Sequence, residues 1–274
     1  MSSDEDFVPA EALTYDQAIA NLRQPDDPGL RYYAAWWLGR FRMAEPEAIA
    51  LLIAALADDL DRAPEGGYPL RRNAARALGK LGSVEAVEPL IGCLDCDDYY
   101  VREAAADALG ELGDARAIAG LVNLLDGGIA AAVPVEGKPH LTQPYAAILE
   151  ALGKLGAREH QGAVEAFLNH AQDRIRFSAG RALYQLTGEA RYAEVVAAGL
   201  DAPDLQRRRS ALMDVGAIGY LPAAERVAAT LAENSLKLIS LRGLLESALA
   251  TPDGPAGAIA PAAERVMDLM DSLL

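Results

Sequence analysis

Few residues of this 274-residue sequence have the types and spacing that catalysis by the chain itself would need. Only three histidines are present, His140, His160 and His170, and none belongs to an H-E-x-x-H metal motif. His140 lies in a long insertion, where it could donate a proton or could simply be an exposed loop residue. His160 and His170 fall in one predicted helix and are expected at the surface. The sequence has no phosphate-binding glycine loop and no G-x-S-x-G motif, so it offers no complete catalytic set.

The two cysteines form a C-x-x-C pair, Cys93 and Cys96. A zinc site needs a second pair, and a thioredoxin-like redox site needs a β-α-β context; the sequence has neither. Cys93 is therefore predicted to be a small core residue, with Cys96 near a helix end. Transient covalent catalysis by one of the thiols is the alternative.

Aromatic residues are concentrated in one segment, because five of the sixteen fall between Tyr32 and Phe41. Alignment with the repeats described below places Trp37 and Phe41 in apolar, core-facing columns. Tyr32 and Trp36 occupy columns that are otherwise charged, and their i, i+4 spacing puts them on one outward patch of a helix. Such a patch could stack on a planar ligand or contact a partner. The alternative is that a leading helix, residues 15–22, covers the patch as an N-terminal cap.

A second group combines tyrosines with arginines. Tyr68 and Tyr99 lie at the same position of adjacent repeats, and each precedes an arginine, Arg71 or Arg102. Guanidinium groups bind carboxylates through two parallel hydrogen bonds, so an arginine row in an acidic protein could dock carboxylates. The alternative is that each arginine bridges to a carboxylate of the adjacent repeat. Further copies of the arginine stand at Arg31 and Arg176.

All these residues belong to a repeated pattern that predicts the fold. Five segments read almost alike, and the basic unit is about 31 residues long: 30–41, 70–82, 101–113, 144–156 and 175–187. Each unit holds two helices with one-sided apolar stripes, and small residues such as Ala108 predict close helix approach. The first helix should end at the glycines of its LGxLG segment, because glycine tolerates the left-handed conformation common at helix ends.

A single helix pair of this length cannot bury its apolar face alone, so stacked pairs must share a core. The predicted fold is therefore all-α, a solenoid of HEAT-like helix pairs. We expect one domain over residues 1–274, with a flexible N-terminus at residues 1–13.

Two insertions interrupt the period, one between Asp58 and Pro69 and the other from Asp126 to Gln143. Both fall between the second helix of one pair and the first helix of the next, so both should emerge from one edge. Loops longer than about 12 residues in a compact array are usually functional or disordered. Two of them on one edge favour a binding rim there.

Composition limits the partners. The formal net charge is −15, from 25 basic and 40 acidic residues, and this repels phosphate backbones, so we expect no nucleic-acid partner. No apolar run approaches the roughly 20 residues that a bilayer-spanning helix needs, and the acidic start lacks a signal-peptide core. A cytoplasmic protein without membrane insertion or a metal is expected. The terminal helix, residues 262–274, has an apolar side that could contact a partner subunit or could cap the array.

Four segments together carry a family resemblance: LRYYAAWWLGRF, LRRNAARALGKLG, VREAAADALGELGD and GKPHLTQPYAAILEALGKLG. They resemble the phycocyanobilin lyase alpha subunits, which are the E-type subunits of the cyanobacterial E/F bilin lyases, over roughly residues 14–274. Many HEAT-like proteins carry ALGxLG repeats, whereas the YYAAWWLG and PHLTQPYAAILEALG segments are more telling. The N-H-C-Q-G-N signature of the isomerising F-type subunit is missing from the sequence, which argues against that subunit.

The resemblance implies a heterodimer with an F-type subunit that attaches phycocyanobilin to a cysteine of the phycocyanin alpha subunit. Phycocyanobilin would be the substrate and not a permanently bound cofactor, and the acceptor would supply the nucleophilic sulfur. A HEAT-repeat scaffold for a bilin or phycobiliprotein, a chromophore-detaching protein of phycobilisome turnover, and a lyase for a related bilin are the alternatives. The candidate bilin-binding residues are Tyr32, Trp36, Tyr68, Arg71, Tyr99 and Arg102, and the candidate proton donors are His140 and Tyr99.

Overall fold

The computed structural model describes residues 13–64, 66–250 and 260–274. Helices make up every named element of these residues, and the one β-type pairing among them is an isolated bridge between Pro134 and Leu141. The prediction of an all-α fold of helix pairs is therefore confirmed. The predicted flexible segment, residues 1–13, lies outside the described residues except for its last residue.

The chain forms two compact units, residues 1–112 and residues 113–274, and each is described by itself. The expectation of one continuous domain stays a prediction. No described helix is both long enough and apolar enough to span a bilayer.

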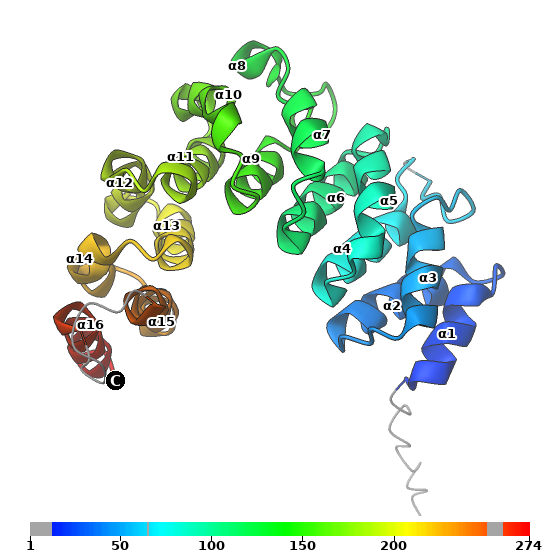
Figure 1. The fold of residues 1–274 in the computed structure, drawn as a ribbon, viewed down its shortest axis with the longest axis horizontal. Coiled ribbons are helices and arrows are strands. Elements are labelled where there is room, and N and C mark those ends of the chain that lie inside the picture. The colour runs from blue at the N-terminus through cyan, green and yellow to red at the C-terminus, as the bar shows by residue number, and fades with distance from the viewer. Residues whose placement is uncertain (1–12, 65, 251–259) are drawn as a thin grey trace, which may run out of the picture. The chain divides into compact units, whose positions relative to one another are not determined.

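The first unit packs its helices in neighbouring pairs (Figure 1). Helix α2 contacts α4, and α4 contacts α6, so the first helices of successive repeats form one row. Helix α1 packs on α2, α3 on α4 and α5 on α6, which buries the apolar stripes of the row. The bounds are α1 (Tyr15–Arg23), α2 (Pro28–Arg40), α3 (Pro46–Ala55), α4 (Pro69–Leu81), α5 (Val87–Gly92) and α6 (Tyr99–Leu112).

The second unit has the same organisation, with a row in which α9 contacts α11, α11 contacts α13 and α13 contacts α15. Val266 and Leu269 of the last helix, α16, are buried in the core of this unit, and Met270 packs against it. The structure therefore shows the terminal helix as an end cap. The bounds are α7 (Ala117–Asn123), α8 (Gly128–Ala131), α9 (Tyr145–Lys154), α10 (Gln161–Glu165), α11 (Asp173–Thr187), α12 (Ala190–Ala197), α13 (Leu205–Ile218), α14 (Ala224–Ala229), α15 (Asn234–Ala250) and α16 (Pro261–Asp271).

The two glycines of the LGxLG segments 78–82 and 152–156 have different roles, which corrects the expectation that both end the helix. The first glycine lies inside the helix, where a neighbouring backbone leaves no room for a side chain. A Cβ on Gly39 would lie 2.7 Å from Ala77 Cα, and a Cβ on Gly79 would lie 2.8 Å from Ala108 Cα. The second glycine ends the helix in the left-handed conformation, as Gly82 does at φ 70°. The repeat thus fixes both the helix spacing and the helix end.

The first insertion, between Asp58 and Pro69, is held by one carboxylate. Asp58 accepts hydrogen bonds from the backbone N–H groups of Leu60 and Asp61, both at 3.0 Å, and from Arg31 Nη2 at 2.5 Å. Burial alone would raise the pKa of Asp58, but the hydrogen bonds from Arg31 and the backbone outweigh it and lower the pKa. These bonds fix the start of the insertion, residues 58–61, against α2 of the first unit.

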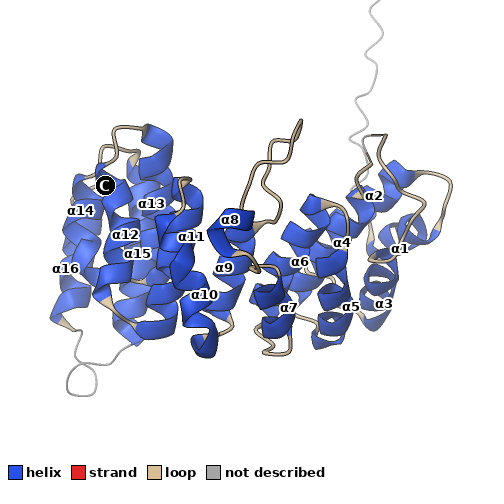
Figure 2. Cartoon of the chain, turned by 90° about the horizontal axis from the view of Figure 1, so that it is seen from above, coloured by secondary structure: helices blue, strands red, loops and turns tan. Residues whose placement is uncertain are grey.

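The second insertion, residues 126–143, begins with α8; the part that follows folds back on itself like a short hairpin, and Figure 2 shows this loop extending away from α8 and α9. Val135 N–H donates to His140 O at 3.1 Å, and Thr142 N–H donates to Val133 O at 3.0 Å. The Thr142 hydroxyl ties the base of this loop to Ala131 O at 2.6 Å.

Candidate functional site

An exposed aromatic pair marks helix α2. The Tyr33 and Trp36 rings stack with centroids 5.4 Å apart and an interplanar angle of 29°. They are 46% and 42% exposed, so α1 leaves Trp36 uncovered, whereas the N-terminal-cap alternative required cover over both Tyr32 and Trp36. The predicted outward patch on α2 exists, but one of its two members differs from the prediction. The ring that stacks on Trp36 belongs to Tyr33, which is exposed, whereas Tyr32 is half-buried.

The position of α2 in its row explains the difference. The equivalents of Tyr33 in the next two repeats, Asn73 and Ala104, are both buried, and Asn73 Nδ2 donates to Tyr32 O at 3.1 Å across the α2–α4 contact. Among the described residues α2 is the first helix of its row, so none of them forms an earlier first helix on the corresponding side of Tyr33. An alignment of the repeats would predict that Tyr33 is buried, as Asn73 and Ala104 are. The preceding first helix that would bury it is absent from the described residues.

The prediction that Trp37 and Phe41 both face the core is half right. Trp37 is buried at 8% exposure, whereas Phe41 is 53% exposed. Helix α2 ends at Arg40, so Phe41 stands at its C-cap and rests its ring on Trp37, with centroids 4.9 Å apart. The expectation for Phe41 was wrong because it assumed that the helix continues.

The Tyr68–Arg71 pair joins the end of the first insertion to the start of α4. The Arg71 guanidinium lies over the Tyr68 ring, 4.1 Å from its centroid, and Tyr68 is buried. Arg71 Nε donates to Asp58 O at 2.8 Å, and Nη2 pairs with Asp59. Asp98 accepts from Tyr68 N–H at 2.8 Å, which brings the Tyr68 segment against the start of α6, where Tyr99 lies.

Arginines at the start of the first helices hold the preceding chain. Arg102 Nη1 donates to Cys96 O at 2.6 Å and to Asp97 O at 3.2 Å. Arg176 makes the equivalent bonds to His170 O at 3.1 Å and to Ala171 O at 3.2 Å. In each case the acceptors lie five and six residues earlier, so the arginine row fastens the turn between two helices. These bonds supply a structural role for Arg102 that the sequence alternatives did not include.

The remaining candidates are dispersed. His140 is half-buried with Nδ1 2.8 Å from Leu141 O, a geometry in which Nδ1 carries the hydrogen. His170 is buried, not on the surface as expected, because its Nδ1 accepts the N–H of Gln172 at 3.0 Å. Cys93 is buried, and burial raises the pKa of its thiol to about 11, so it is protonated near neutral pH. The prediction that Cys93 is a core residue is confirmed.

A charged ladder that sequence reasoning missed crosses three first helices of the second unit. Arg181 of α11 lies 3.5 Å from Glu150 of α9 and 3.3 Å from Asp214 of α13, and the Ser178 hydroxyl donates to Glu150 at 2.9 Å. Burial raises the pKa of Asp214 to about 6, although Arg181 opposes the shift and Glu150 adds to it; Arg174 also lowers it. The repeat alignment contained the signal, since Glu150 and Arg181 occupy one column with opposite charges and Asp214 stands in the next column.

This ladder predicts a pH dependence that Asp214→Asn removes. Because the folded state holds the Asp214 proton more tightly than the unfolded state, stability from this group is present below about pH 4 and is lost as pH rises through about 6. The free energy of unfolding of the wild type, relative to Asp214→Asn, should fall by on the order of 2 kcal/mol between about pH 4 and pH 7. Urea titrations of both proteins at the two pH values measure the difference, and a constant difference would contradict the assignment.

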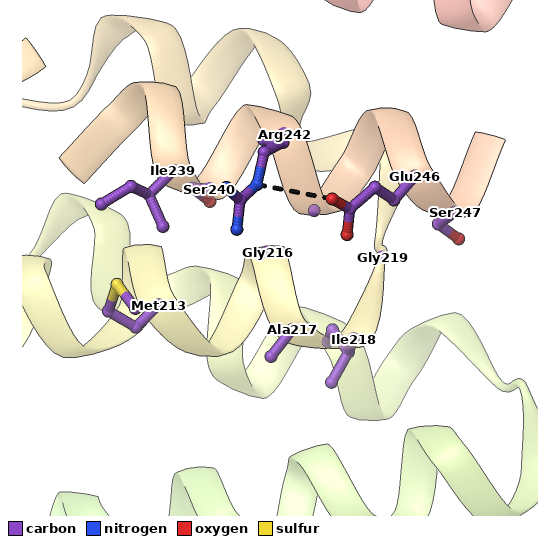
Figure 3. Close-up of a pocket in the computed structure, with 11 residues that line it drawn as sticks. Met213, Gly216, Ala217, Ile218, Gly219, Ile239, Ser240, Arg242, Glu246 and Ser247 are labelled. Carbon is purple, nitrogen blue, oxygen red and sulfur yellow. Dashed lines mark ion pairs between the residues drawn. The ribbon is translucent and has the colours of Figure 1, made fainter. Parts of the chain in front are cut away.

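Two hollows lie on the first-helix rows. One, of about 420 Å³, lies between α13 and α15; Figure 3 shows Met213 and Ile239 facing it from the two helices, beside the Arg242–Glu246 ion pair. The other, of about 520 Å³, lies at the C-terminal ends of α2 and α4. We call it the cationic hollow, because its lining contains three basic residues and one acidic residue: Arg40, Arg42, Lys80 and Glu111.

The cationic hollow adjoins the aromatic pair along α2. Trp36 and Arg40 are one helical turn apart, about 6 Å along the axis, so they lie on the same side of α2. Lys80 holds the equivalent position on α4, and both Arg40 and Lys80 are exposed. This surface, which we call the α2–α4 face, offers a flat aromatic contact beside a group of cations: Tyr33, Trp36, Arg40, Arg42 and Lys80.

Comparison with known families agrees with the helix-pair fold. The HEAT repeats family matches residues 60–131, and the PBS lyase HEAT-like repeat family matches residues 30–58.

Relatives cover nearly the whole chain. The phycocyanobilin lyase subunit alpha of Synechococcus elongatus is 65% identical over 97% of this chain and 98% of its own length. The protein of the same name from Synechocystis sp. is 57% identical over 96% of this chain and 97% of its own length. Among solved structures, the complex of CpcE and CpcF of phycocyanin lyase from Nostoc sp. contains a chain that is 53% identical, with a TM-score of 0.88 and complete coverage of both chains.

Proposed function

This chain belongs to the family of phycocyanobilin lyase alpha subunits, and we propose that it is one half of a heterodimeric lyase that attaches phycocyanobilin. The observation that carries the proposal is the 65% identity with a relative of that name over nearly the full length of both chains. The partner would be an F-type subunit, since the structural relative comes from a CpcE–CpcF complex. The acceptor would be a cysteine of the phycocyanin alpha subunit, and the reaction would take place in the cytoplasm of a cyanobacterium.

The chemistry of attachment explains why the chain needs no nucleophile of its own. The thiolate of the acceptor cysteine adds to the ethylidene group of the bilin, one carbon–sulfur bond forms, and the bilin takes up one proton. No oxidant or reductant is required. The buried thiol of Cys93, with its pKa of about 11, is unsuited to compete as a nucleophile.

The contribution of this chain would be orientation. Holding a flexible pigment with its reactive end towards the acceptor converts a bimolecular encounter into a positioned reaction. The stacked Tyr33–Trp36 pair is a flat, exposed surface suited to a planar conjugated ring system. We place the bilin on the α2–α4 face and add Tyr33 to Trp36 as a ring contact.

The other predicted contacts keep their place as proposals. Tyr32 lies on α2 beside the stacked pair, and Tyr68 and Arg71 shape the first insertion. Tyr99 and Arg102 form the first turns of α6. The proton would come from Tyr99, His140 or solvent.

Co-expression tests this function. The chain, an F-type subunit, the phycocyanin alpha apoprotein and phycocyanobilin should together yield an alpha subunit whose colour survives denaturation in acidic urea. Omission of this chain should abolish the covalent colour. Loss of colour from an alpha subunit that already carries the bilin, without attachment to the apoprotein, would overturn the proposal in favour of detachment. Binding of bilin with neither reaction would identify a scaffold.

A further inference from the structure

The cationic hollow contains an arginine at a position where glycine is expected. Arg42 is the one described residue other than glycine with a positive φ, 55°. The same column holds Gly82, Gly113, Gly156 and Gly219 in other repeats, with φ between 65° and 70°. The left-handed conformation costs a residue with a Cβ roughly 1 kcal/mol or more, so the first repeat gives up stability to place a guanidinium there.

The Arg42 side chain reaches across to α4. Its Nη1 donates to Lys80 O, the carbonyl near the end of that helix, at 2.8 Å. This bond holds the guanidinium at the end of α4, and Lys80 and Arg40 of the last turns of α4 and α2 line the same hollow. Glu111 is the single acidic residue of the lining. Its carboxylate lies close to Gly79 of α4, because a Cβ built on Gly79 would be 2.9 Å from Glu111 Oε2. Three cations around one carboxylate leave a net positive site in a chain of net charge −15.

We propose that the cationic hollow binds the propionate carboxylates of the bilin while its rings lie against Tyr33 and Trp36. This inference rests on the proposed function and names the groups that orient the substrate. Fixing the two carboxylates and one ring face restricts how the pigment can lie along α2. Arg40, Arg42 and Lys80 are positioning residues on this assignment, and none takes part in proton or bond transfer.

A purely structural explanation makes different predictions. Basic residues in the last turn of a helix interact favourably with the negative end of its dipole, and Arg40 and Lys80 both stand there. If that were their whole purpose, their replacement would lower stability and leave bilin affinity unchanged. Arg42 separates the two explanations most clearly, because glycine at its position should relieve the backbone.

The experiment uses the complex of the full chain with its F-type partner, titrated with phycocyanobilin and with its dimethyl ester, which lacks both carboxylates. The wild-type complex should bind the ester about tenfold more weakly than the free acid, as expected for lost charge-assisted hydrogen bonds. Arg42→Gly should bind the free acid about fivefold more weakly and the ester as the wild type does. Its unfolding temperature should stay the same or rise.

Lys154→Gln is the matched control for Lys80→Gln. Both lysines are exposed and belong to an identical ALGKLG segment, at 77–82 and 151–156, but Lys154 does not line the cationic hollow. Lys80→Gln should lose affinity for the free acid, and Lys154→Gln should keep it.

Equal binding of acid and ester by the wild type, or an equal loss in both lysine variants, overturns the propionate assignment. If the same complex still transfers bilin to the apoprotein, the proposed function survives that result. A complex that neither binds nor transfers bilin overturns both.

Discussion

Replacing Gly153 with alanine should destabilise the protein by about 3 kcal/mol, at the upper end of what an added core methyl usually costs. A Cβ at this position would lie 2.7 Å from Ala182 Cα and 2.9 Å from Ala182 Cβ. Neither atom can move without shifting α11, because Ala182 is buried in the contact between α9 and α11. Chemical denaturation monitored by circular dichroism measures the loss.

Gly162→Ala is the control, because it makes the same chemical change in the same unit. Gly162 lies in α10, is exposed, and has no atom within 4 Å of its ideal Cβ. Alanine there should be neutral or should stabilise the helix by about 0.5–1 kcal/mol. Equal effects of the two substitutions would mean that helix propensity, and not the spacing between α9 and α11, decides the cost at Gly153.

The repeat explains how much of the fold could be predicted from sequence. Periodicity located the helix pairs because burial of a one-sided apolar stripe is a local, additive requirement. The core position of Cys93 followed instead from the absence of a zinc or thioredoxin context around the C-x-x-C pair, and the structure buries Cys93. The separate roles of Gly79 and Gly82 could not be read from spacing, because close approach and helix termination both favour glycine.

The candidate site was harder to predict because its features depart from the repeat. Tyr33 is exposed since α2 opens its row, and Phe41 is exposed since the helix ends one residue earlier. An alignment of the repeats shows neither where a row of helices begins nor where a helix ends, so it could not predict either exposure. Arg42 did carry a signal, the replacement of a recurrent glycine, but its meaning needs the left-handed backbone and the bond to Lys80 O.

The arginines illustrate the opposite case, where a repeated residue has a repeated structural role. Arg102 and Arg176 donate to carbonyls at the same two offsets, so their recurrence follows from the fold. A residue that recurs is explained first by packing, and a residue that breaks the recurrence is the better indicator of ligand binding. By that criterion the first repeat, with its exposed aromatic pair and Arg42, is where the pigment should bind.

The double variant Tyr33→Ala, Trp36→Ala should reduce bilin transfer by the heterodimer about 30-fold or more. Removal of an aromatic stacking partner costs about 1–3 kcal/mol per ring contact, and each 1.4 kcal/mol is a factor of ten. Both side chains are more than 40% exposed, so the helix should keep its fold and its contact with α4. Covalent colour on the phycocyanin alpha subunit, followed over time, measures the loss, and circular dichroism checks the fold.

Leu30→Ala supplies the control, because Leu30 lies on the same helix at a similar exposure of 43% and is outside the aromatic stack. Its variant should transfer bilin at the wild-type rate. Tyr32→Ala, Trp36→Ala compares the pair that sequence spacing selected with the pair that the structure stacks. If stacking against α2 holds the pigment, the double variant with Tyr33→Ala should lose more transfer activity than the double variant with Tyr32→Ala. The reason is that Tyr33 is exposed and Tyr32 is half-buried. Wild-type transfer by both double variants would remove α2 from the binding surface and leave the cationic hollow without its neighbouring aromatic contact.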